Sequence, residues 1–151
     1  MLIDGVPARL SVELGEAGRT VRCGAQIVPS PPRSHAADVR AMVQRWLRVR
    51  ATGELPPLVH AHAASLGIAV SRVTIRDQRS RWGSCSRQGS ITLNWRLLQM
   101  PPFVREYIVI HELMHRREMN HSPRFWRHVA GACPRYLEAR KWLRTDGKKL
   151  L

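Results

Sequence analysis

The segment His111-Glu112-Leu113-Met114-His115 governs how the rest of this sequence is interpreted. It follows Pro101 and Pro102, which suit the first turn of a helix, and the apolar pattern predicts that this helix runs to about Met119. Residues four apart lie on one face of a helix, so both imidazoles can bind one metal ion while Glu112 projects beside them toward a zinc-bound water. The segment therefore predicts a zinc site with a glutamate as its general base.

A third protein ligand is needed, because a catalytic zinc usually binds three protein ligands and leaves the fourth position to water. His121 is the preferred candidate, since it falls in the tight turn between the motif helix and a new helix that starts at Ser122-Pro123. His128 and Glu138 on the following helices remain alternatives. A helix-borne glutamate serves as the third ligand in other zinc hydrolases.

The remaining elements alternate between strand-like and helix-like patterns. Apolar alternation predicts a hairpin of residues 8–14 and 19–28, followed by a proline-rich linker at 29–34, a helix at 36–51, and a second, short helix from Pro56 to Gly67. Strands at 71–77 and 90–94 flank a polar loop at 78–89, and a last helix covers about 135–144. This order favours an α+β fold over a doubly wound parallel sheet.

Length and composition limit the class of protein. A chain of 151 residues matches one domain over residues 1–151, and its longest apolar stretch is far short of the ~20 residues that span a membrane. Three cysteines without CxxC spacing argue against a disulfide framework and a thiolate zinc site, and they favour a reducing cytoplasm. The net charge of +14 would attract nucleic acid or another polyanion, although a genome rich in arginine codons explains it equally well.

Two regions before the motif are weaker candidates for substrate binding. Arg76, Arg79, Arg81 and Arg87 surround Trp82, a combination that can hold phosphates or stack on a base, although Trp82 can equally pack in the core. Asn94 ends the strand Ser90–Asn94, whose edge either pairs with an extended peptide or completes the sheet.

Four segments together resemble the YgjP-like family of zinc-dependent hydrolases, which is related to the SprT-type metalloproteases. They are Arg79–Ser86, Ile91–Trp95, His111–His115 and Asn120–Trp126, and the resemblance covers roughly residues 34–146. It implies a small zincin-like domain with a mixed sheet, in which His111, His115 and His121 bind zinc and Glu112 is the catalytic base. The hairpin and linker of residues 1–33 stand in place of a longer N-terminal β-rich region.

The expected function is therefore that of a zinc-dependent hydrolase, with a metallopeptidase acting on peptides or proteins as the first choice. Zinc is the expected cofactor. Two other classes remain open: a zinc-dependent hydrolase of nucleotides or other phosphate anhydrides, suggested by the arginines near Trp82, and a nucleic-acid-associated module that contains a zinc site.

Overall fold

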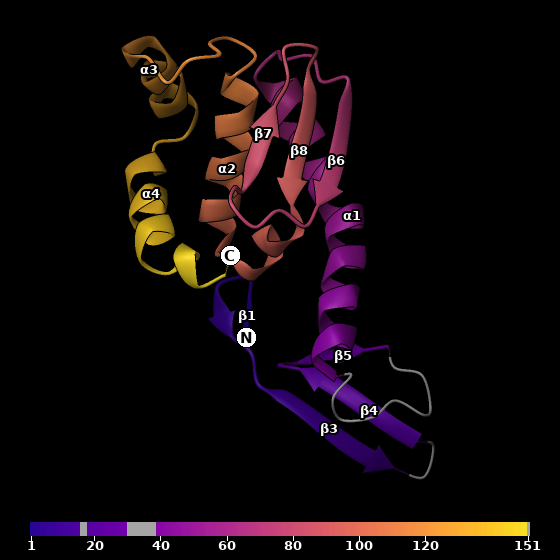
Figure 1. Ribbon diagram of the computed structural model, residues 1–151. Coiled ribbons are helices and arrows are strands. Elements are labelled where there is room, and N and C mark those ends of the chain that lie inside the picture. Colours follow the sequence, from indigo (N-terminus) through magenta and orange to yellow (C-terminus); the bar gives the residue numbers. More distant parts are fainter. Residues whose placement is uncertain (16–17, 30–38, 151) are drawn as a thin grey trace.

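The computed structural model describes residues 1–15, 18–29 and 39–150, and it has the expected α+β architecture (Figure 1). The N-terminal strands are β1 (Leu2–Ile3), β2 (Val6–Pro7), β3 (Leu10–Gly15), β4 (Gly18–Cys23) and β5 (Gln26–Val28). They precede the long helix α1 (Val39–Ser65), strands β6 (Arg72–Arg76), β7 (Gly83–Cys85) and β8 (Ser90–Asn94), and the 3-10 helix η2 (Trp95–Gln99). The chain ends with helices α2 (Pro102–Met114), α3 (Pro123–Ala132) and α4 (Tyr136–Thr145) and the 3-10 turn η3 (Gly147–Lys149).

The central sheet is mixed and has the strand order β6-β8-β7. β6 runs parallel to β8, whereas β7 is antiparallel to it, with Ser84 opposite Thr92. The expectation of an irregular loop over residues 78–89 was wrong, because Gly83–Cys85 forms a strand there whose three residues show no apolar alternation of their own. Since β8 is central, its edges are both paired, and β7 provides the free edge that faces α2 (Figure 1).

A single helix, α1, replaces the two helices expected on either side of Pro56 and Pro57. The two prolines remove the hydrogen bonds to the carbonyls of Thr52 and Gly53, at a typical cost of about 3 kcal/mol for a proline inside a helix. Thr52 and Gly53 are exposed, so water can bind these carbonyls. A continuous buried stripe crosses the prolines and keeps the helix intact: Val43, Leu47, Ala51, Leu55, Val59 and Ala63.

The N-terminal hairpin is a three-stranded antiparallel sheet of order β3-β4-β5. The expected second strand at 19–28 is divided by a turn at Gly24, after which β5 folds back on β4. Val21, Cys23 and Val28 are buried, and β5 contacts α1. This sheet projects from the rest of the molecule at the start of α1 (Figure 1). The expected linker and the start of the next helix, at residues 30–38, lie outside the described residues.

The motif helix is shorter than the sequence pattern predicts. α2 ends at Met114, and His115 is its C-cap with helical backbone angles, so the motif occupies the last turn of the helix. α3 begins at Pro123 as expected, because the Ser122 hydroxyl accepts a hydrogen bond from the Phe125 amide at 3.3 Å. In the described part of the chain, every helix is too short or too polar to span a bilayer.

Candidate metal centre

Three histidines from two neighbouring elements meet at the end of α2. His111 lies on α2, His115 caps it, and His121 reaches back from the turn before α3. Their ligand atoms all lie within 4.8 Å of one another, and the Nε2 atoms of His111 and His121 are 3.0 Å apart. Two nitrogens bound to one tetrahedral zinc lie roughly 3.3 Å apart, given Zn–N bonds of about 2.0–2.1 Å. The cluster therefore has the size that one metal ion needs.

Hydrogen bonds orient two of these imidazole rings. The Nδ1 atom of His111 lies 3.3 Å from the Tyr107 hydroxyl, and the Nδ1 atom of His115 lies 3.1 Å from the carbonyl oxygen of Glu118. Histidines that bind a metal usually use the second ring nitrogen in this way, which fixes both the tautomer and the orientation of the ring. The arrangement leaves the Nε2 atoms of both rings available as metal ligands.

Electrostatics keep the two motif histidines neutral. Burial, supported by the neighbouring His115 and His121, lowers the pKa of His111 to about 3. Burial also lowers the pKa of His115, although the Glu118 carbonyl opposes the effect. A neutral imidazole has the lone pair that a metal requires, so the site is prepared for a cation without first losing protons.

The other two candidates for the third ligand lie outside this group. His128 is half-buried on α3 and is not among the clustered donors. Glu138 is exposed on α4, where its carboxylate forms an ion pair with Arg135 at 2.7 Å. Of the three alternatives that the sequence left open, the structure brings only His121 to the motif histidines.

Glu112 is buried beside the histidines, with 7% of its surface exposed. Burial raises the pKa of its carboxyl group to about 7, and the positive charge of Arg81 opposes that rise. A carboxylate with a pKa near the working pH suits a general base, because it can both accept and release a proton there.

Gly83 on β7 is a site residue that the sequence interpretation missed. A Cβ atom added to Gly83 would lie 2.8 Å from both Cγ and Oε1 of Glu112, a distance shorter than Cβ atoms in proteins show to other heavy atoms. The strand thus approaches Glu112 as closely as it does only because position 83 has no side chain. The one signal in the sequence was a glycine directly after Trp82, which by itself also fits an ordinary turn.

Two cavities adjoin His111 and Glu112 on either side of Gly83. One, of about 300 Å³, extends past the other two histidines along β7; besides these residues it is lined by Ser84, Cys85, His115, Met119 and His121. The other, of about 270 Å³, extends toward α4; its further lining residues are Arg81, Trp82, Tyr107, Ile108 and Leu143. Arg81 and Trp82, which the sequence suggested as substrate-binding residues, therefore lie next to the candidate metal centre.

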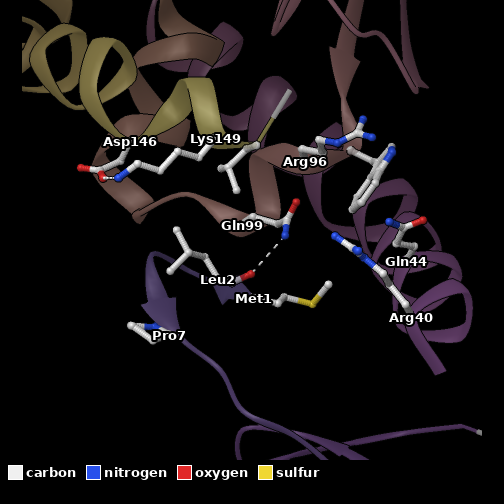
Figure 2. A pocket seen from close by; sticks show the side chains of 11 residues that line it. Met1, Leu2, Pro7, Arg40, Gln44, Arg96, Gln99, Asp146 and Lys149 are labelled. Carbon is white, nitrogen blue, oxygen red and sulfur yellow. Dashed lines mark hydrogen bonds and ion pairs between the residues drawn. The ribbon is translucent and has the colours of Figure 1, made fainter. Parts of the chain in front are cut away.

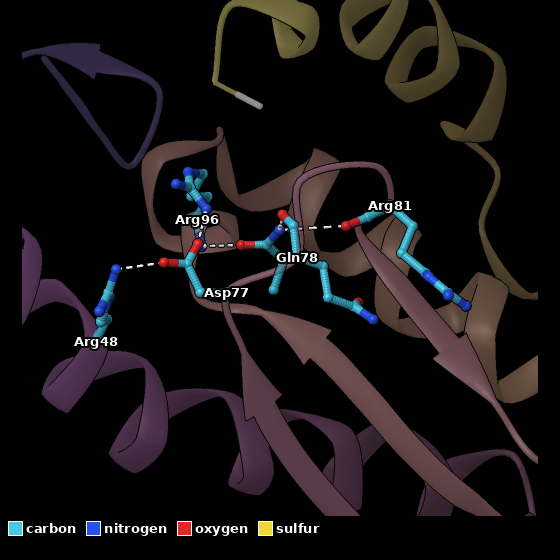
Figure 3. A network of polar contacts seen from close by, with 6 residues as sticks. Arg48, Asp77, Gln78, Arg81 and Arg96 are labelled. Atoms are coloured by element: carbon cyan, nitrogen blue, oxygen red, sulfur yellow. Dashed lines mark hydrogen bonds and ion pairs between the residues drawn. The ribbon is translucent and has the colours of Figure 1, made fainter.

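Asn94 does not fit its expected role in substrate binding. It is fully buried, and its amide nitrogen donates hydrogen bonds to the carbonyls of Gln78 at 2.6 Å and Arg81 at 3.2 Å (Figure 3). Its amide oxygen accepts from the Arg96 backbone at 3.1 Å. Asn94 therefore shapes the loop before β7 from inside the protein. Arg79 is exposed on this loop and lines neither cavity beside the histidines.

A larger cavity, of about 570 Å³, lies elsewhere (Figure 2). It separates the N-terminal strands from η2 and the C-terminal turn, and the Gln99 side chain crosses it to the carbonyl of Leu2 at 3.4 Å. Two of its cations are already paired, Arg96 with Asp77 and Lys149 with Asp146. In the part of the chain that the structure describes, the group of side chains that could bind a metal ion lies at the histidines, and none of its members lines this cavity.

A family model described as YgjP-like, metallopeptidase domain, matches residues 1–146, so the match includes the N-terminal strands that the resemblance noted in the sequence had left out. Among solved structures, the chain is similar to the metallopeptidase zymogen abylysin of Pyrococcus abyssi, with 28% identity, coverage of 60% of this chain and 93% of that chain, and a TM-score of 0.49. None of the curated proteins matches the chain.

Proposed function

This chain belongs to the YgjP-like metallopeptidase family, and on that premise we propose that it is a zinc-dependent peptidase with Glu112 as its general base. One observation carries the proposal: three histidine nitrogens lie within 4.8 Å of one another beside a buried glutamate. His111, His115 and His121 would hold the metal. Three imidazole donors are the ligand set of a known class of catalytic zinc sites.

Zinc, when bound, supplies a Lewis acid that activates water and polarises the scissile carbonyl. Glu112 accepts the proton of the attacking water and later donates it to the leaving amine, which its pKa near 7 permits. Gly83 leaves room for the carboxylate, and Tyr107 holds His111 in the orientation that directs Nε2 to the cluster.

The free edge of β7 supports a peptide as the substrate. The Trp82 carbonyl accepts a hydrogen bond from β8, and the Ser86 amide donates one to β8. Because backbone groups alternate in direction along a strand, those of Gly83 and Cys85 point away from β8, toward the free edge. Both residues line the cavities at the histidines. An extended peptide added to this edge would pass directly beside Glu112. The sequence interpretation had considered this role for β8, with completion of the sheet as the equal alternative.

Hydrolysis of phosphate anhydrides receives less support from the geometry. Its case rested on several arginines converging on phosphate groups, but Arg76 and Arg79 are exposed and line neither cavity at the site. Arg81 alone is left beside Glu112. One cation offers little to offset the charge of a polyphosphate during displacement.

The test is hydrolysis of an unfolded protein by the purified chain with about one equivalent of zinc. Glu112→Gln is expected to keep the metal and lose activity by at least about a hundredfold, because the proton acceptor is gone and the volume is nearly unchanged. Glu138→Gln, a change of the same chemistry at an exposed position, is the control and keeps its activity. Zinc-dependent release of pyrophosphate from nucleoside triphosphates without peptide cleavage would replace this proposal with the phosphate alternative.

We also propose that the protein works in a reducing cytoplasm and that its basic surface contacts a polyanion. The three cysteines are unpaired, which fits that compartment. α3 and α4 lie on the side of α2 away from the sheet (Figure 1). They expose several cations with no ion-pair partner among the described residues: Arg124, Arg127, Lys141 and Arg144. Such a surface suits a chain of phosphates.

A further inference from the structure

We propose that the cavity between β7 and α4 binds an apolar side chain of the substrate while Arg81 at its mouth binds a carboxylate of the same peptide. The inference rests on the proposed peptidase function and names the class of peptide that the site takes. It starts from the cavity of about 270 Å³ that adjoins His111 and Glu112.

The walls of this cavity are mainly apolar. Trp82, Ile108 and Leu143 line it and also belong to or pack against the buried core. Tyr107 adds its ring, while its hydroxyl is already paired with His111 at 3.3 Å. An apolar side chain entering here loses water contact without leaving a polar group unpaired.

Arg81 is the one cation among the residues that line the cavity. Its side chain is exposed, forms no ion pair with the acidic residues of the described ranges, and points away from Asp77 and Gln78 (Figure 3). Its backbone, in contrast, is fixed, because Asn94 binds the Arg81 carbonyl from inside the protein. A held backbone and a free guanidinium at the mouth of an apolar cavity suit a carboxylate, which arginine binds through two parallel hydrogen bonds.

The size of the cavity separates this ligand from a nucleotide. Pockets for drug-sized ligands occupy about 300–1,000 Å³, and this one falls just below that range. It accommodates a single large side chain. The carboxylate has two sources, the C-terminus of a peptide or the side chain of an adjacent acidic residue, and a set of matched peptides distinguishes them.

The experiment measures the binding of short peptides by calorimetry to the zinc-loaded Glu112→Gln variant, which binds without cleaving. The probes are N-acetyl-Ala-Ala-Leu with a free carboxylate, its amide, the amidated peptide N-acetyl-Ala-Ala-Leu-Asp-Ala, and a Ser-for-Leu version of the first. Arg81→Ala is added in the same background, and Arg76→Ala, an exposed arginine on the edge strand β6, is the control.

Arg81→Ala is expected to weaken the binding of the carboxylate peptides by roughly tenfold or more and to leave the binding of the amide of N-acetyl-Ala-Ala-Leu unchanged. If the free acid alone depends on Arg81, the C-terminus is the source; if the Asp peptide does, the source is a side chain. Replacing Leu by Ser in the peptide should reduce its affinity by about tenfold, and Arg76→Ala should leave the affinity of every peptide unchanged.

Equal binding of all four peptides, or equal losses in the Arg81 and Arg76 variants, would overturn the inference. These outcomes are independent of the peptidase proposal, because binding is read in a variant that does not turn over. Conversely, wild-type protein that binds these peptides through Arg81 but hydrolyses no peptide would keep the subsite and contradict the proposed reaction.

Discussion

His121 contributes most to the identification of the candidate site, because it completes the cluster of three histidines from outside the HExxH segment. It is exposed, and its Nε2 atom lies 3.0 Å from that of His111. His128, seven residues on, has the same side chain but is not part of the cluster. The pair therefore offers a matched comparison of a clustered histidine with a separate one.

We expect His121→Ala to lose most of the bound zinc, since two imidazoles alone bind it far more weakly than three, while His128→Ala keeps about one zinc per chain. Elemental analysis of the purified variants measures both. Zinc retained by His121→Ala and lost from His128→Ala would assign the third ligand to α3 instead. Circular dichroism of the two variants shows whether either change unfolds the chain.

Among the strands, β7 affects the site most because it approaches Glu112 without a side chain in between. A methyl group at position 83 would lie 2.8 Å from Glu112, so the carboxylate or the strand must move. Gly83→Ala is expected to reduce kcat by roughly tenfold or more, because small displacements of a catalytic group are costly. Zinc content should be unchanged, since no ligand is touched.

Gly53→Ala is the control for this prediction, because a Cβ at position 53 has no neighbour within 4 Å. In the exposed part of a helix this change should stabilise the protein slightly and leave the activity as it is. Full activity of Gly83→Ala would show that Glu112 has other room to move and that the close approach of β7 is not needed.

Three elements, α1, β6 and η2, meet at Asp77, which follows the last residue of β6. Its carboxylate pairs with Arg48 of α1 and with Arg96 of η2 (Figure 3). Partial burial raises the pKa of Asp77, but the hydrogen bond from Arg96 and the charges of both arginines outweigh this, and the net pKa is lowered. The ion pairs thus connect the long helix to the segment that leads into α2.

A carboxyl group with a lowered pKa in the folded state stabilises the fold above its unfolded pKa of about 3.9, and this stability is lost as the pH falls through the folded value. Asp77→Asn should therefore destabilise the protein by about 1 kcal/mol at pH 7, given the exposure of the pairs. The difference in Tm between the wild-type protein and the Asp77→Asn variant should disappear as the pH drops below about 4. A gap that is constant from pH 7 to pH 3 would assign the effect to something other than charge.

For the whole molecule, we propose that residues 1–151 form one folding unit. The buried cluster contains Val21 and Val28 of the N-terminal sheet together with Val43 of α1 and Val109 of α2. One shared core predicts a single cooperative transition on heating. Val21→Ala and Val109→Ala should each reduce the free energy of unfolding by about 1–3 kcal/mol and so lower the Tm of that one transition. Two separate calorimetric peaks, with Val21→Ala shifting only one, would contradict this.

The charge of +14 also acts through the whole molecule. Binding to unrelated DNA duplexes should be independent of sequence and should weaken steeply as salt rises. Arg124→Gln with Arg127→Gln on α3 is expected to reduce the salt dependence by about two phosphate contacts, whereas Arg72→Gln with Arg76→Gln on β6 has little effect. No DNA binding at low salt, or an equal loss of DNA binding in both double variants, would show that these cations are only solvated and form no specific polyanion-binding surface.

Local patterns were sufficient to predict the histidine cluster and the fold class. Four-residue spacing places His111 and His115 on one helix face in any structure that keeps the helix, and the Ser122-Pro123 start forces a turn that contains His121. The α+β class followed from the order of strand-like and helix-like segments, and the structure confirms it. Such features depend on neighbours in the chain, which a sequence displays directly.

The features that were missed depend on contacts between distant segments. α1 continues through Pro56 and Pro57 because its buried stripe packs on the core, a stabilisation that no local propensity reports. β7 is a strand only because β8 pairs with it, and the buried position of Asn94 follows from the loop that folds over it. The same pairing brings Gly83 against Glu112, 29 residues away along the chain, and places Arg81 among the residues that line the apolar cavity. Packing alone sets these juxtapositions, since each one joins groups that the sequence keeps apart.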